Sequence, residues 1–382
     1  MSATETNAAS QPPPAAAKPA RRWAPRAWLG CNASGWLRLL WRNRFAVGLT
    51  YSYIAVIDTF GSFVNSFLCL VQRAVFGRRV ARTELAAPPV FILGHWRSGT
   101  TLLHELLILD PRHTFPTTYQ CFSPNHFLLT ENVVSRWLWF VMPEKRPMDN
   151  MAMGWDRPQE DEFALCNLGQ PSPYLTIAFP NHPPQYSEYF NLDVPADARE
   201  RWKGALLGFL RHVTFKSPLR IILKSPPHTC RIPVLLEMFP EAAFINIVRN
   251  PYTLFASTVN LWKSLYRAHG LQKPRFEGLE EYVLTTFSRM HERLEATRGL
   301  VAPQRFYDLR YEDLTANTVG ELRKLYAHLG WPGYEELRPS FEAYLMAIGE
   351  YKTNRYELSP EWRAEVTRRW KPYFDRYGYE AE

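Results

Sequence analysis

The stretch that decides the fold is FILGHWRSGTTLL, residues Phe91 to Leu103. It begins with an apolar run into Gly94, reaches a second glycine at Gly99, and continues through a hydroxyl pair into an apolar helix. This spacing is typical of a phosphate loop, in which backbone N–H groups at a helix N-terminus hold an anion. The lysine that follows the second glycine in the ATP-binding version is missing, because Thr100 occupies its position. The sequence therefore predicts an anion-binding loop that holds something other than a metal-bound triphosphate.

Five consecutive residues of this loop suit a single phosphate or sulfate group. Arg97 is the cation inside the turn, and a guanidinium can make charge-assisted, bidentate contacts with an oxyanion. Ser98, Gly99, Thr100 and Thr101 add backbone N–H groups and hydroxyls at the start of the helix. We expect all five residues to contact the bound group.

A second strand-to-helix turn lies in FINIVRNPYTLFASTVNLW, residues 244–262. The apolar run ends at Arg249, Asn250 is a favoured N-cap residue, and Pro251 suits the first helical position. Ser257 follows eight residues after Arg249. A nucleoside triphosphatase would place an acidic residue at such a strand end to hold Mg²⁺. Because arginine stands there instead, we expect Arg249 and Ser257 to bind a further phosphate.

The two loops together resemble those of the sulfotransferases that use 3′-phosphoadenosine 5′-phosphosulfate (PAPS), a family with a P-loop-like fold. The resemblance covers roughly Pro88 to the C-terminus, about three quarters of the chain. It implies that the first loop binds the 5′-phosphosulfate and that Arg249 and Ser257 bind the 3′-phosphate. A Tyr-Glu-Asp motif that starts at Tyr311 also matches the family and implies a tyrosine near the adenine.

The resemblance implies an enzyme that transfers a sulfuryl group from PAPS to a hydroxyl or amine acceptor, with no metal. This displacement needs a positioned acceptor, a proton acceptor and neutralised charge on the leaving oxygen. Arg97 cannot give up its proton, so we expect it to act as an electrostatic clamp. Lys224, in the segment ILKSPPHTCRIP, resembles the lysine that lies beside the transferred group in the family. The alternative is a surface lysine at a strand exit.

The sequence departs from the cytosolic branch of this family. That branch carries lysine in the first loop and tryptophan after the threonine pair, where this chain has Arg97 and Leu102. It is closer to the bacterial, tyrosyl-protein and carbohydrate branches. The late Arg-Lys-Gly loop is also missing, and Lys352 and Arg355 are weak substitutes for it.

The candidates for the general base cluster in DRPQEDEFAL, residues 156–165. We expect Asp156 to cap a helix whose first turns contain the acids, with Glu160 or Glu162 favoured over Asp161. Acids are also common at helix N-termini because they complement the helix dipole, so a purely structural role is the alternative. His228 is the next candidate for the base, or a loop histidine. The remaining candidates are two further histidines, His113 and His126.

From residue 87 onward the pattern predicts an α/β fold, a P-loop-like three-layer arrangement around a central parallel sheet. One helix should follow the first loop, with leucines on its buried side and with His104 and Glu105 solvated on the other. The apolar runs that we expect to be strands are Val90–Leu93, Ile221–Leu223, Phe244–Val248 and Arg305–Leu309.

The chain of 382 residues divides into three parts. Residues 1–25 are rich in Ala and Pro and predict a disordered tail, without the pattern of a signal peptide. Residues 26–86 predict an N-terminal helical extension, and residues 87–382 a sulfotransferase domain. Within it, residues 115–218 are too long for one crossover and should cover the acceptor side. Their aromatic residues suit a carbohydrate or a lipid acceptor.

The segment Phe45–Val71 is apolar except for Asp58 and small polar residues. Asp58 divides it into two pieces, each shorter than the ~20 residues of a spanning helix. Three alternatives remain: helices packed on the domain or forming a lid, helices lying in a membrane interface, and a true span. The first of these is the favoured expectation, and the flanking Arg and Trp residues keep the membrane alternatives open.

The charge of the chain limits the kinds of partner that we expect, and its cysteine content indicates the cellular compartment. The net charge of +8 suits an anionic ligand, but the basic residues are dispersed, so we expect no nucleic acid. A small molecule, a lipid or a carbohydrate is the expected acceptor. Five widely spaced cysteines favour a reducing compartment. We therefore expect a cytoplasmic protein, with the membrane surface as an alternative position.

Two other functions stay open on the sequence alone. One is a P-loop kinase or nucleoside triphosphatase, which Thr100 and Arg249 oppose. The other is a non-enzymatic, membrane-peripheral nucleotide-binding protein, which would require the carboxylates to lie far from the anion loops.

Overall fold

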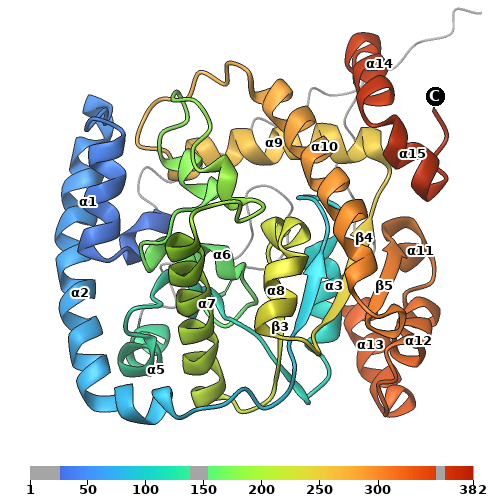
Figure 1. Ribbon diagram of the computed structural model, residues 1–382, viewed down its shortest axis with the longest axis horizontal. Coiled ribbons are helices and arrows are strands. Elements are labelled where there is room, and N and C mark those ends of the chain that lie inside the picture. Colours follow the sequence, from blue (N-terminus) through green and yellow to red (C-terminus); the bar gives the residue numbers. More distant parts are fainter. Residues whose placement is uncertain (1–25, 138–153, 350–357, 382) are drawn as a thin grey trace, which may run out of the picture.

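The computed structural model describes residues 26–137, 154–349 and 358–381 (Figure 1). Its centre is a parallel five-stranded sheet with the strand order β2-β3-β1-β4-β5. Four strands match the expected runs to within one residue at each end, whereas the two-residue β2 was not expected, because two residues carry no periodicity. The strands are β1 Val90–Leu93, β2 His113–Thr114, β3 Arg220–Lys224, β4 Ala243–Val248 and β5 Phe306–Arg310.

The alternation of side chains along β1 divides the core between the two faces of the sheet. Val90 and Ile92 pack with leucines of the helix that follows β1 and with the helices that follow β5. Phe91 and Leu93 face the other way, into a larger core that includes the helices between β3 and β5. All four side chains are fully buried, and each such burial contributes about 1.5 to 3 kcal/mol. This confirms the three-layer α/β fold.

The helices of the two outer layers follow the strands directly along the chain. They are α3 Thr100–Leu107, α8 Ile232–Met238, α9 Pro251–His269, α10 Leu279–Thr297, α11 Tyr311–Ala316, α12 Thr318–His328, α13 Tyr334–Ile348, α14 Pro360–Arg369 and α15 Lys371–Tyr377.

The described residues between β2 and β3 form a mostly helical region. It contains α4 Thr118–Phe122, α5 Phe127–Trp137, α6 Asp161–Asn167, η4 Pro173–Ala178, η5 Ser187–Tyr189 and α7 Ala196–Lys216. The expected helix start at Asp156 is wrong, because α6 begins at Asp161 with Glu160 as its N-cap. The reason is that the backbone around Arg157 pairs with the start of α4: Thr118 N–H donates to Arg157 O at 2.8 Å.

The expected solvation of His104 and Glu105 is also wrong. Both side chains are buried, His104 completely. The region between β2 and β3 covers this side of α3: the Phe115 ring lies 6.0 Å from the His104 ring, and Arg157 pairs with Glu105 at 3.3 Å.

The N-terminal extension consists of η1 Ala27–Gly30, α1 Ala33–Arg42, η2 Leu49–Tyr51 and α2 Ser52–Ala81. From Ser52 onward the apolar segment belongs to one continuous helix of 30 residues, and Asp58 does not divide it into two pieces. It runs along the outer edge of the molecule, on the side opposite α14 and α15 (Figure 1). Leu49–Ala81 is long and apolar enough to cross a membrane by length and composition alone. The tail predicted for residues 1–25 lies outside the described residues.

Candidate active site

The first loop adopts a conformation that two of its residues can reach only as glycine. Gly94 has φ +137°, and an added Cβ would lie 2.6 Å from Ile247 O. Gly99 has φ +107°, and an added Cβ would lie 2.3 Å from a ring carbon of Tyr311. Arg97 has φ +71°, a left-handed conformation that is rare for a residue with a side chain and typical of functional loops. The backbone of this loop is therefore closely fitted to its neighbours.

Some residues of the first loop stabilise the turn itself, and others lie at the N-terminus of the helix that follows it. Ser98 uses both its hydroxyl, at 2.8 Å, and its N–H, at 3.2 Å, to donate to His95 O within the turn. Arg97 Nε donates to Ser257 Oγ at 2.9 Å. Thr100 and Thr101 form the first turn of α3, where backbone N–H groups have no partner within the helix. This arrangement fits an anion at the N-terminus of α3.

The second turn is bonded directly to the first loop. Arg249 is buried, and its Nη1 donates to Arg97 O at 3.0 Å. Asn250 caps α9 as expected, because its Oδ1 accepts from the N–H groups of Tyr252 and Thr253. Tyr373 of α15 holds the backbone: its hydroxyl accepts from Arg249 N at 2.9 Å and donates to Arg249 O at 3.0 Å. The two turns thus lie together at one edge of the sheet, as expected for neighbouring parallel strands.

The Tyr-Glu-Asp motif joins the same edge of the sheet. The Tyr311 ring lies against Gly99, and the Arg249 guanidinium stands 4.2 Å from its centroid. Glu312 accepts hydrogen bonds from Asn250 N at 2.8 Å and from the Tyr379 hydroxyl at 2.9 Å. The structure therefore brings all three predicted motifs together.

Glu160 and Lys224 form an ion pair beside the first loop. Lys224 Nζ, at the end of β3, donates to Glu160 Oε1 at 2.6 Å. The Lys224 side chain is 2% exposed and the Glu160 side chain is 15% exposed, so the carboxylate keeps some access to solvent while the lysine does not. The other carboxylate oxygen accepts a short hydrogen bond from the Tyr174 hydroxyl, to which Trp96 Nε1 donates at 2.9 Å. Because Trp96 precedes Arg97, this chain of hydrogen bonds joins the carboxylate to the anion loop.

Burial, and then the neighbouring Glu160 carboxylate, raise the pKa of the Tyr174 hydroxyl well above its usual range. Tyr174 therefore stays protonated and remains a donor to Glu160. A carboxylate held by two donors and partly open to solvent can accept a proton from a bound hydroxyl group.

Glu162, the alternative base, lies in a different environment. Its carboxylate is fully buried and accepts from Arg231 Nη1 at 2.5 Å and from Nη2 at 3.0 Å. Ser172 also donates to it. The position follows from helical geometry, because a residue two positions after Glu160 points to the opposite side of α6. Glu162 therefore stabilises the core, and we do not retain it as the base.

His228 is likewise enclosed. Its Nε2 donates to Asp161 Oδ2 at 2.7 Å, the Ser225 hydroxyl donates to Asp161 Oδ1 at 2.8 Å, and all three side chains are fully buried. Burial alone would raise the pKa of Asp161, but His228 and Ser225 outweigh it, and the pKa is lowered. A fully buried histidine cannot reach the hydroxyl group of an acceptor substrate, so His228 is a poor candidate for the base.

The two remaining histidines lie within other contacts. His113 interacts with Leu107 O at 3.0 Å, and His126 Nε2 with Asn65 Oδ1 of α2 at 3.0 Å. Lys352 and Arg355 lie outside the described residues.

Sequence reasoning missed the contributions of Trp96, Tyr373 and Arg231, and it covered Tyr174 only as one of the aromatic residues of the segment 115–218. Trp96 and Arg231 stand next to or within motifs already singled out, so their position was a usable signal. Tyr373 lies 124 residues from Arg249 and carries no local signal.

The geometry brings two strand-to-helix turns and a partly exposed carboxylate together, and the comparisons identify the class of protein. The chain belongs to the sulfotransferase family, because the family model described as "Sulfotransferase family" matches residues 88–336. It therefore transfers a sulfuryl group, and the kinase alternative is not supported.

Two relatives are similar over almost their whole length. Each is an omega-hydroxy-beta-dihydromenaquinone-9 sulfotransferase Stf3, one from Mycobacterium bovis and one from Mycobacterium tuberculosis strain CDC 1551. Each is 53% identical over 361 residues, which cover 94% of this chain and 93% of the relative.

Two solved structures share the fold. Sulfotransferase STF1 from Mycobacterium tuberculosis H37Rv has a TM-score of 0.59 at 18% identity, and the match covers 90% of this chain and 94% of that chain. Sulfotransferase STF9 from Mycobacterium avium has a TM-score of 0.60 at 18% identity, with 92% and 98% covered.

Proposed function

We propose that the enzyme transfers the sulfuryl group of PAPS to a terminal hydroxyl of an isoprenoid quinone lipid. The observation that carries the proposal is the Glu160–Lys224 pair, which hydrogen bonds join to the two-loop anion site. The lipid acceptor is supported by the relatives, whose name specifies an omega-hydroxylated menaquinone derivative. The two anion loops of this chain support PAPS as the donor nucleotide.

The two loops suit a nucleotide with an anionic group at each end of its ribose. Arg249 and Ser257 would bind the 3′-phosphate, and the first loop would bind the 5′-phosphosulfate. The direct contacts between Arg97 and Ser257 and between Arg249 and Arg97 O fix the spacing of the two subsites. Tyr311 lies beside both and would contact the adenosine.

In the proposed reaction the acceptor oxygen forms a bond to sulfur, and the bond between sulfur and the 5′-phosphate oxygen breaks. Glu160 takes the acceptor proton, and the products are a sulfate ester and adenosine 3′,5′-bisphosphate. Arg97 neutralises the charge that develops on the leaving oxygen without giving up a proton. Lys224 orients the Glu160 carboxylate and adds positive charge beside the transferred group.

The test is sulfuryl transfer from ³⁵S-labelled PAPS to an omega-hydroxylated menaquinone in detergent, followed by extraction of the lipid. We expect label in the lipid and none with the same quinone lacking the terminal hydroxyl. Glu160→Gln should lower transfer by about 10²-fold or more, whereas the matched control Glu277→Gln, which changes an exposed glutamate before α10, should not. Labelling of a carbohydrate or of an amine in preference to the lipid alcohol would contradict the proposal.

A further inference from the structure

We propose that the outer face of α1 and α2 docks on the surface of an anionic lipid bilayer, with α2 lying in the plane of the membrane. We call this face the N-terminal docking surface; its apolar members are Leu37, Trp41, Phe45, Leu49, Val56, Phe60, Phe63, Phe67 and Leu70. The inference concerns where the enzyme works, and it does not depend on which acceptor it uses.

The polarity of α2 is the reverse of that of an ordinary surface helix. Its buried residues include Asp58, Ser62, Asn65 and Gln72, all polar. Its outward residues are apolar and follow a helical spacing of three and four, and each is between 55% and 73% exposed: Val56, Phe60, Phe63, Phe67 and Leu70. A continuous apolar stripe of this kind marks an interaction site and is uncommon on a protein that meets only water.

The polar inner face is bonded to the rest of the protein along the helix. Asn65 Nδ2 donates to Leu29 O at 2.7 Å and to Cys31 O at 3.0 Å. Gln72 Nε2 donates to Asn125 O at 3.2 Å, and its Oε1 accepts from Leu128 N at 2.9 Å. A spanning orientation would draw these partners into the hydrocarbon or break the bonds. Lying in the interface leaves them intact, which decides between the two membrane arrangements.

The apolar stripe continues beyond α2 onto the preceding elements. Trp41 is 75% exposed at the end of α1, and Leu49 is 90% exposed at the start of η2. Phe45, between them, is also more than half exposed. Aromatic rings at the rim of an apolar face are typical of helices that lie at the lipid headgroup level.

The charges of this region specify the chemistry of the occupant. Between residues 27 and 83 the only acid is Asp58, and it is buried. The arginines of the same region are all exposed: Arg38, Arg42, Arg44, Arg73, Arg78, Arg79 and Arg82. Anionic lipid headgroups complement this excess of positive charge. A second copy of the chain would bring the same arginines together, so the charge pattern opposes self-association.

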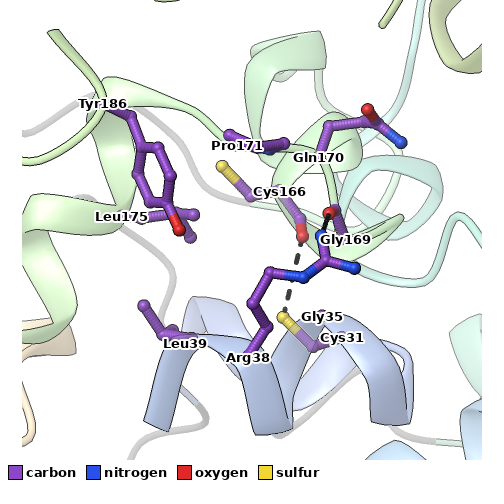
Figure 2. A pocket seen from close by; sticks show the side chains of 10 residues that line it. All are labelled: Cys31, Gly35, Arg38, Leu39, Cys166, Gly169, Gln170, Pro171, Leu175 and Tyr186. Carbon is purple, nitrogen blue, oxygen red and sulfur yellow. Dashed lines mark hydrogen bonds between the residues drawn. The ribbon is translucent and has the colours of Figure 1, made fainter. Parts of the chain in front are cut away.

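One short helix, α6, separates the candidate active site from the inner side of the N-terminal extension. Glu160 stands at the N-terminus of α6, and Asn167 at its end is bonded to the N-terminal extension, because Asn32 N donates to Asn167 O at 3.0 Å. A helix of seven residues is roughly 10 Å long. Figure 2 shows the small pocket at this junction, where Leu39 and Arg38 of α1 face Leu175 and Cys166. An enzyme docked on this face would hold its active site close to acceptors in the bilayer.

Co-sedimentation with vesicles tests the inference. Full-length protein should bind vesicles of phosphatidylcholine that contain phosphatidylglycerol and should bind pure phosphatidylcholine less. The triple variant Phe60→Ser/Phe63→Ser/Phe67→Ser should lose at least about tenfold in vesicle binding. The matched control, Leu300→Ser/Met346→Ser, removes exposed apolar side chains far along the chain and should bind like the wild type.

The remaining measurements separate the alternatives. About 1 M salt should weaken the binding, since the Debye length falls to roughly 3 Å. Affinity for adenosine 3′,5′-bisphosphate should be the same in the triple variant and the wild type, which shows that the variant is folded. Vesicle binding that survives the triple substitution overturns the inference. So do resistance to an alkaline carbonate wash, which indicates a span, and a dimer that the triple substitution dissociates, which indicates a second copy as the occupant.

Discussion

Glu160 occupies an N-cap position but does not cap its helix, since its carboxylate makes no hydrogen bond to the first turn of α6. Both oxygens are instead held by Lys224 and Tyr174. We expect Glu160→Gln to lower kcat by about 10² to 10⁴, because it removes the proton acceptor. The affinity for adenosine 3′,5′-bisphosphate, measured by calorimetry, should not change. A variant that keeps wild-type kcat would rule Glu160 out as the base.

Glu162→Gln should behave differently, although it lies two residues away. It leaves the fully buried Arg231 without its charge partner, which in comparable sites costs roughly 3 to 5 kcal/mol. Thermal unfolding should show a lower Tm for this variant, in contrast to Glu160→Gln. If Glu162→Gln melts like the wild type but is inactive, the assignment of the two acids is reversed.

Arg97 is expected to act mainly in the transition state. Arg97→Ala should lower kcat by about 10² or more, because removing one preorganised donor to a developing oxyanion costs ~2.7 to 4 kcal/mol in comparable sites. Binding of the bisphosphate should suffer less. Steady-state kinetics with PAPS check this, and full activity in the alanine variant would mean that the loop holds a different group.

At the scale of elements, α15 supports the second anion turn through Tyr373, whose hydroxyl both accepts from and donates to the backbone of Arg249. Tyr373→Phe leaves that buried N–H without its partner, which costs about 1 to 3 kcal/mol. We expect weaker binding of adenosine 3′,5′-bisphosphate with little change for AMP, which lacks the 3′-phosphate. An equal loss for both nucleotides would indicate a general destabilisation rather than a role in positioning Arg249.

The α2 helix contains a buried carboxyl group, Asp58, whose effect on the stability of the protein can be tested. Burial raises its pKa from an ordinary value of 3.8 to about 7. The folded state therefore binds a proton that the unfolded state releases, and stability falls as the pH rises from about 4 to about 7. Each pKa unit corresponds to about 1.4 kcal/mol, so Asp58→Asn should stabilise the protein at pH 8 by up to roughly 4 kcal/mol. Unfolding at pH 5 and pH 8 tests this, and a gain that is equal at both would contradict it.

On the scale of the whole molecule, the sequence was most informative where chemistry and backbone conformation coincide. Gly99, Arg97, Arg249 and Ser257 follow from the spacing of two strand-to-helix turns, and the structure places them at one sheet edge. Predicting these turns as anion loops required no long-range information.

The sequence could not separate Glu160 from Glu162. Their roles are set by Lys224 and Arg231, which lie 64 and 69 residues further along the chain. The continuity of α2 was missed for a similar reason: Asp58 interrupts the apolar pattern, but it points toward protein and not toward lipid or water. Contacts with residues far along the chain decide both the environments of the two glutamates and the continuity of α2. The periodicity of the sequence does not reveal such contacts.

Calorimetric binding of adenosine 3′,5′-bisphosphate, AMP and ATP, with and without Mg²⁺, tests the central claim most directly, that two anion loops hold a nucleotide phosphorylated at both ends of the ribose. The contact of a 3′-phosphate with Arg249 and Ser257 is worth roughly 1.5 to 3 kcal/mol, so the bisphosphate should bind about 10- to 100-fold more tightly than AMP, independently of Mg²⁺. Equal affinity for the bisphosphate and AMP, or a Mg²⁺-dependent preference for ATP, would contradict the account.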